Sequence, residues 1–149
     1  MKRVVFQNRF WRIAGIVLLL VLLGMTVVWA RAFYGAYTNY EQGKALADRQ
    51  SYVRAVTYLD RSLHWYTPFN PFVEKSARQL WAIGEMAEAQ GDVDLALIAY
   101  RSIHRGFFAA RGFVRPGDEW IKKSSEKTRD LTRRLRSDAS RPHEEPVET

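Results

Sequence analysis

The sequence contains no cysteine, which excludes disulfide bonds and thiolate metal sites. It has only three histidines, and none of them stands at the spacing of a known metal-binding motif. A glycine-rich phosphate loop, a nucleophile elbow and an HExxH motif are also absent from the sequence. We therefore expect no enzymatic activity, no cofactor and no metal site.

The sequence also lacks any stretch in which apolar and polar residues alternate for long enough to predict a β-strand. Apolar residues instead recur at spacings of three and four, which predicts an all-α protein. Polar residues at the starts of these patterns predict the helix caps. The expected helices cover 52–65, 71 to about 91, a segment after 92 and a segment after 118, with Ser51, Asn70, Asp92 and Asp118 as their respective N-caps.

One apolar run stands apart from this amphipathic pattern. It extends from Ile13 to Ala30, and its 18 residues include no charge. As a helix it would be about 27 Å long, close to the hydrocarbon thickness of about 30 Å in a bilayer. We predict that 13–30 is a transmembrane helix, and that it continues into the first helix of the following domain because no proline intervenes before Arg49.

Basic residues are concentrated before this run. The net charge is +7, and four of the positive charges lie in the leader 1–12, which leaves about +3 for the rest of the chain. Positive charge on one side of a span stays cytoplasmic, so we expect a cytoplasmic N-terminus and an exported domain, which in a bacterium means an inner-membrane protein with a periplasmic domain. The alternative is a signal peptide cleaved at Ala30-Arg31-Ala32, although the apolar run is longer than is usual for one.

The remainder divides into a domain over 31–136 and a tail over 137–149, which has little to bury and is expected to be disordered. The modest charge of the domain comes with no base-reading motif, so we expect no nucleic acid partner. Ala32 and Ala36 are small residues four apart, a spacing that lets two membrane-proximal helices approach closely. A homo-oligomer is therefore one possible assembly.

Two segments of the domain align at an offset of 41 residues, which places Gly43 on Gly84 and Ala55 on Ala96. The same offset places Leu59 on Tyr100. This spacing of small and large residues resembles the tetratricopeptide repeat (TPR), a helix pair of about 34 residues. The resemblance implies that the glycines and alanines allow close helix packing, that the fifth helix caps the stack, and that the domain binds other proteins. The longer period is a departure from the family, as is Asn39 where the first repeat would have a tryptophan.

Three surface features are candidates for partner binding. Two are rich in aromatic side chains, which are common at binding hot spots but which would equally fill the core of a connector. The third is the basic face of the fifth helix, which is either a solvated surface or a surface attracted to anionic headgroups. The aromatic candidates are Trp65, Tyr66, Phe69 and Phe72 in the first segment, and Phe107, Phe108, Arg111 and Phe113 in the second; the basic face comprises Lys122, Lys123, Lys127, Arg129, Arg133, Arg134 and Arg136.

These features together predict a membrane-anchored, TPR-like scaffold that binds proteins of an envelope assembly and contacts membrane lipid. The alternative is a small accessory subunit of a larger transport or secretion complex. Such a subunit would bind its partner chiefly through the transmembrane helix.

Overall fold

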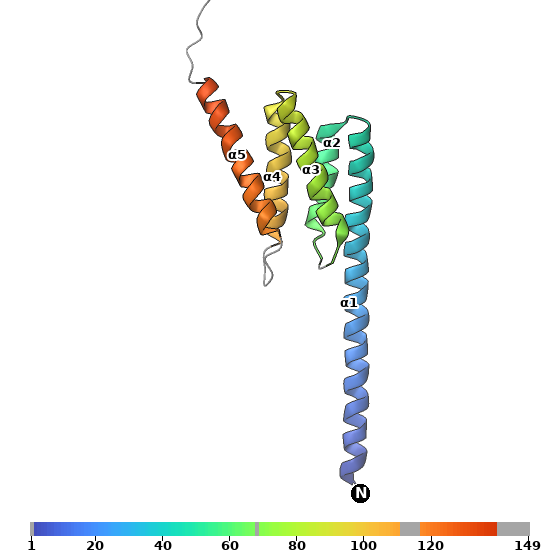
Figure 1. Ribbon diagram of the computed structural model, residues 1–149. Coiled ribbons are helices and arrows are strands. Elements are labelled where there is room, and N and C mark those ends of the chain that lie inside the picture. Colours follow the sequence, from blue (N-terminus) through green and yellow to red (C-terminus); the bar gives the residue numbers. More distant parts are fainter. Residues whose placement is uncertain (1, 68, 111–116, 140–149) are drawn as a thin grey trace, which may run out of the picture.

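The computed structural model describes residues 2–67, 69–110 and 117–139 (Figure 1). The described residues form helices and connecting turns and contain no strand, which confirms the all-α prediction. The second and third helices begin as expected and end within about two residues of the expected bounds, and the fourth begins directly after Asp92 as expected. The fourth helix continues through Arg105 and Gly106, where we expected the chain to loosen, to Ala109. The five helices are α1 (Lys2–Asp48), α2 (Tyr52–His64), α3 (Pro71–Ala89), α4 (Val93–Ala109) and α5 (Asp118–Ala139).

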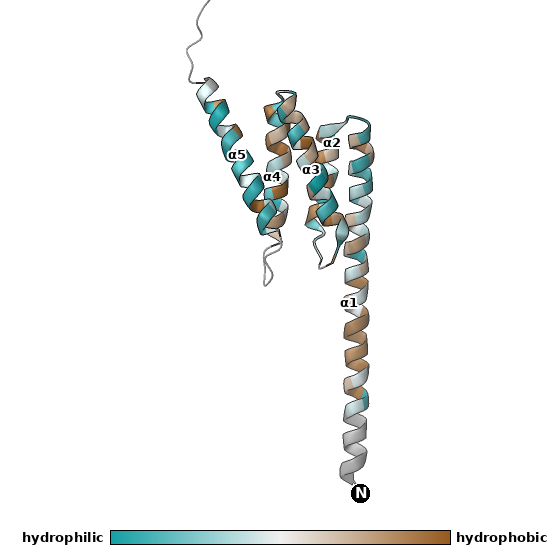
Figure 2. Cartoon of the chain, viewed as in Figure 1, coloured by the Kyte–Doolittle hydropathy of each residue, from teal (hydrophilic) through white to brown (hydrophobic). Residues whose placement is uncertain are grey.

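Helix α1 contains both the apolar run and the first helix of the domain, without a break between them. Its apolar half extends away from the other helices (Figure 1), and Figure 2 shows the concentration of hydrophobic residues there. Leu19 and Val28 in this half are 66% and 70% exposed. Among the described residues, α1 is the one helix that is long and apolar enough to cross a membrane. The predicted continuation of the apolar helix into the first helix of the domain is therefore confirmed.

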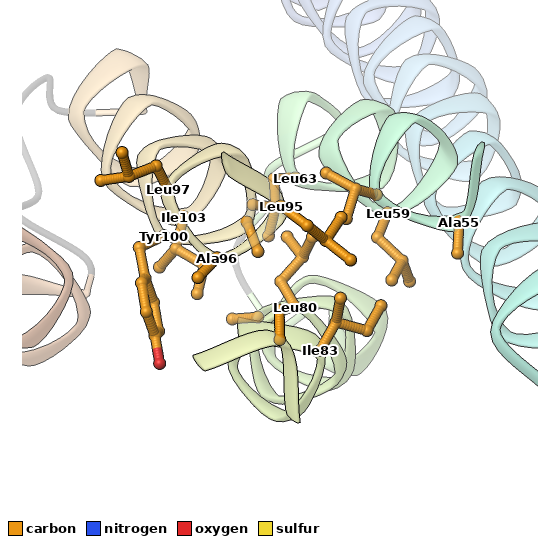
Figure 3. Close-up of a cluster of buried hydrophobic side chains, with 14 of the residues drawn as sticks. Ala55, Leu59, Leu63, Leu80, Ile83, Leu95, Ala96, Leu97, Tyr100 and Ile103 are labelled. Carbon is orange, nitrogen blue, oxygen red and sulfur yellow. The ribbon is translucent and has the colours of Figure 1, made fainter. Parts of the chain in front are cut away.

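The C-terminal half of α1 packs against α2 and α3. Helix α3 packs against α4, and α4 packs against α5. The main core lies between α2, α3 and α4 (Figure 3). Ala32 and Ala36 belong to the contact surface of α1 within the chain, with exposed fractions of 9% and 0%. The Ser62 hydroxyl donates a hydrogen bond of 2.9 Å to the carbonyl oxygen of Ala36. These two alanines thus serve packing inside the domain and are not available to a second copy of α1.

Two glycines related by the offset of 41 residues lie at close contacts between helices. A Cβ added to Gly43 on α1 would lie 2.7 Å from the Leu59 side chain on α2. A Cβ added to Gly84 on α3 would lie 2.7 Å from the Tyr100 ring on α4. Both pairs therefore need a hydrogen atom at the glycine position, and the two pairs are related by the same offset of 41 residues. The other expected packing residues, Ala55 and Ala96, are fully buried.

Two of the four predicted caps are confirmed. The Asn70 side chain accepts a hydrogen bond from the Phe72 backbone at 3.1 Å, and Asp92 accepts one from Leu95 at 3.0 Å. Ser51 stands at the start of α2, but its side chain forms no capping hydrogen bond.

The expected cap at Asp118 is wrong, because this residue is already the first of α5. The residue before α5 is Gly117, whose carbonyl accepts from Ile121 at 2.9 Å. Its φ of 72° favours glycine, and an added Cβ would overlap the Phe107 ring. Helix α5 continues to Ala139, so it ends three residues after the expected domain boundary, and residues 140–149 of the predicted tail lie outside the described residues.

The close contact between α3 and α4 predicts the effect of a single methyl group. Gly84→Ala should lower the free energy of unfolding by about 1–3 kcal/mol, because the Tyr100 ring must move. Unfolding of the full chain in detergent micelles measures this change. Gly24→Ala in the apolar half of α1 is the control, since a Cβ there meets no atom within 4 Å. Equal stability of the two variants would contradict the packing described above.

Candidate functional site

A groove of about 690 Å³ runs between α4 and α5. It opens because α5 leans away from α4 toward its C-terminal end (Figure 1). Among the described residues, the lining carries five arginines and no acidic residue. The lining residues are Arg101, His104 and Arg105 of α4, with Ser125, Thr128, Arg129, Thr132, Arg133 and Arg136 of α5.

The N-terminal part of α5 is held against the bundle by Trp120. Its indole N–H donates a hydrogen bond of 2.9 Å to Glu74 on α3. Its ring packs against Trp81 with a centroid distance of 5.9 Å, and it stacks on Phe107 at 6.4 Å. Farther along α5, Leu131 is buried, whereas Leu135 is 39% exposed. The apolar side chains of α5 thus attach one side of the helix to the bundle, and the groove opens on another side of the helix.

A second attachment of α5 is polar and centres on Glu88 of α3. Its carboxylate accepts hydrogen bonds from the Tyr100 hydroxyl of α4 at 2.5 Å and from the Lys127 ammonium of α5 at 2.8 Å. Burial alone would raise the pKa of Glu88, but the hydrogen bonds from Lys127 and Tyr100 outweigh it and leave this pKa below its ordinary value. Burial, together with the neighbouring Glu88 carboxylate, raises the pKa of Tyr100. Three helices therefore meet at one ionised carboxylate.

The arginines of the groove differ in whether they are neutralised. Arg105 forms an ion pair with Asp60 of α2 at 3.1 Å. The other four form no ion pair with any carboxylate in the part of the chain that the structure describes: Arg101, Arg129, Arg133 and Arg136. Thr128 also lines the groove, although its hydroxyl oxygen is buried and has no hydrogen-bond partner among the described residues. This arrangement can bind carboxylates or other anions, because guanidinium groups pair with planar anions through two parallel hydrogen bonds.

The first aromatic segment is divided between packing and exposure. The Trp65 ring covers Gly35 of α1, and an added Cβ at Gly35 would lie 2.8 Å from it. Phe72 packs against aromatic rings of α1, including Tyr37 at a centroid distance of 5.0 Å. Tyr66 is partly buried against the core. In contrast, Phe69 is 98% exposed. Of this segment, Phe69 therefore presents its whole ring outward.

The second aromatic segment is divided in the same way. Phe107 is 3% exposed and belongs to the core. Phe108 is 56% exposed and stacks on His104 with a centroid distance of 5.8 Å. Arg111 and Phe113 lie outside the described residues. Tyr66 and Phe69 of the first segment and Phe107 of the second nevertheless line one hollow of about 380 Å³, so the two segments meet there. A binding role for these residues stays a prediction.

The basic face of α5 is apparent in the sequence, whereas the arginines that α4 supplies to the groove were not predicted. Arg101 and Arg105 are four residues apart, which places them on one face of a helix. Arg129 and Arg133 repeat this spacing on α5. Two arginine pairs at this spacing on adjacent helices are a detectable signal, but the relative rotation of the helices decides whether the pairs face each other.

No protein-family model, curated protein or solved structure matches this chain. The TPR resemblance therefore stays a prediction. Among the described residues, no group of three or more histidines or acidic residues could hold a metal ion.

The Glu88 cluster predicts a pH-dependent stability. Glu88→Gln should lower the free energy of unfolding by about 1–3 kcal/mol at pH 7, because the ionised acceptor of two hydrogen bonds is lost. A carboxyl group with a depressed pKa stabilises the fold above its ordinary pKa of 4.5, and this contribution disappears as the pH falls through the lower pKa of the folded state. The difference between the two proteins should therefore shrink below about pH 4.5.

Denaturant unfolding of the full chain in micelles at several pH values checks this prediction. Glu85→Gln is the matched control, since Glu85 is exposed on the same helix. A Glu88→Gln effect that stayed constant down to pH 3, or that equalled the Glu85→Gln effect, would contradict the role given to the cluster.

Proposed function

We propose that this protein is a membrane-anchored helical scaffold that binds an acidic segment of a partner protein in the groove between α4 and α5. The observation that carries the proposal is the set of four groove arginines without a described carboxylate partner. Unneutralised arginines at close range repel one another, so an incoming carboxylate gains more from the groove than from an isolated arginine.

The size and chemistry of the groove favour a peptide segment. Its volume of about 690 Å³ accommodates a few side chains rather than a folded domain. Arginine is enriched at protein-binding hot spots, and its planar group pairs with carboxylates in a defined geometry. Thr132 adds a half-buried hydroxyl between the charges, and because this hydroxyl donates to the Thr128 carbonyl, its oxygen is left to accept a hydrogen bond from a peptide amide.

The apolar half of α1 supports the anchoring part of the proposal. A tether of this kind keeps scaffold and partner in one membrane plane, which raises their effective concentration and lets weak contacts suffice. The basic leader supports a cytoplasmic N-terminus and an exported domain, which in a bacterium is periplasmic. The matched contacts at Gly43 and Gly84 support a TPR-like stack of two helix pairs, with α5 as its capping helix.

The alternative function is that of an accessory subunit bound through its span. It is supported by the exposure of the apolar half of α1 around its whole circumference, from Ile16 to Val28. A lipid bilayer would cover the same surface. This alternative predicts that partner association is independent of the groove.

Charge reversal in the groove tests the proposal. The full chain in nanodiscs is titrated with a fluorescent glutamate-rich peptide, and binding is followed by anisotropy. Arg129→Glu combined with Arg133→Glu should weaken binding at least about tenfold, equivalent to about 1.4 kcal/mol. Binding to the unmodified chain should also weaken as the salt concentration rises.

The matched control is Arg49→Glu combined with Arg54→Glu, which changes the net charge equally at exposed positions outside the groove. Loss of affinity in both variants would mean that net charge alone attracts the peptide. Failure of the unmodified chain to bind the peptide, or tighter binding of an oligonucleotide of equal charge, would overturn the proposal.

A further inference from the structure

Phe69 lies in the connection between α2 and α3 and presents an almost fully exposed aromatic ring. Its side chain is 98% exposed, and its φ is 65°, a conformation that L residues rarely adopt. The backbone next to it is fixed by Asn70, whose N–H donates to the Thr67 carbonyl at 3.2 Å and whose side chain caps α3. The hydrogen bonds of Asn70 therefore hold the backbone on the C-terminal side of Phe69.

The connection lies at the end of the bundle from which the apolar half of α1 emerges (Figure 1). Contacts of two side chains show which residues of α1 lie beside this connection. Trp65 before it covers Gly35, and Phe72 after it contacts Phe33 with a centroid distance of 5.4 Å. Phe33 and Gly35 are three and five residues beyond Ala30, which corresponds to about 4.5 and 7.5 Å along the helix. The headgroup layer of one leaflet is about 5–8 Å thick, so the connection lies at headgroup level.

The exposed side chains of α1 at this level have the composition of a membrane interface. Trp29, Tyr34 and Tyr37 are 45%, 64% and 41% exposed, and Trp29 stacks on Phe33 at 5.3 Å. Tryptophan and tyrosine are enriched where headgroups meet the hydrocarbon. Arg31 is also exposed in this band, where it can contact lipid phosphates. This aromatic band marks the level of the bilayer surface independently of the length of the apolar run.

We propose that Phe69 inserts into the headgroup layer of the membrane that α1 spans. The lipid, rather than a partner protein, covers the ring, because the ring and the aromatic band lie at one level of the same rigid unit. The domain would then contact the bilayer at two points, α1 and Phe69, and its orientation above the membrane would be restricted. This inference rests on the membrane location of α1 and is independent of the arginine groove.

Site-specific labelling tests the inference directly, because the chain has no native cysteine. Phe69→Cys is labelled with the polarity-sensitive fluorophore NBD in the full chain, reconstituted into phosphatidylcholine–phosphatidylglycerol nanodiscs. Two sets of nanodiscs are used, one with a nitroxide near the lipid headgroup and one with a nitroxide deep in the acyl chain. They quench labels in the headgroup layer and at the bilayer centre, respectively. Val53→Cys is the matched control, since Val53 is 64% exposed at the opposite end of α2. Leu20→Cys reports on the apolar run itself.

We expect the label at position 69 to be quenched severalfold more than the label at 53, with an emission shift to shorter wavelength. Equal, weak quenching at 69 and 53 with strong quenching at 20 would overturn the inference and leave the anchor intact. A wavelength shift at 69 without lipid quenching would also overturn it, because protein would then cover the ring. Absence of quenching at 20 would overturn both the anchor and the inference.

Discussion

The unbroken course of α1 is the constraint on which the rest of the structure depends. One helix carries an apolar half that is exposed all round and a second half that packs against α2 and α3. The change from exposed to packed side chains begins at Ala32, where a stripe of small residues starts on the side of α1 that faces the bundle. Because a helix is stiff over this length, the domain is held at a fixed height relative to the apolar run. The stripe consists of Ala32, Ala36, Gly43 and Ala47.

Small residues also determine how the remaining helices are arranged. Gly43 admits the Leu59 side chain, and Gly84 admits the Tyr100 ring, so that each helix pair packs closely. Tyr100 then extends to Glu88, which connects to Lys127 on α5. The bundle thus positions its last helix through a chain of contacts that starts at α1. The arginine groove opens because α5 is attached to the bundle along one side only, through its narrow apolar stripe and through Lys127.

Much of this fold could be predicted from the sequence, because its determinants are local. The period of the apolar residues gives the helices, and Asn70 and Asp92 mark two of their starts. Local sequence did not correctly predict the side-chain caps at Ser51 and Asp118. At α5 the decisive factor is tertiary, since the Phe107 ring requires a glycine at position 117.

The candidate site was less predictable, because it depends on helix rotation and on which ring faces outward. Phe69 and Phe72 are three residues apart with the same chemistry, yet one is exposed and the other packs on α1. Ala32 and Ala36 have a spacing typical of contacts between membrane helices, but they pack within the chain. In each case tertiary packing decided what the residues contact.

The continuity of α1 is tested most directly by amide hydrogen exchange of the full chain in nanodiscs. The structure predicts uninterrupted protection from the apolar run through Trp29 and Phe33 to Tyr40, since every amide in this stretch lies within one helix. A rapidly exchanging gap between Ala30 and Phe33 would contradict the account. It would show a hinge at the membrane surface and remove the fixed geometry between the span and the domain.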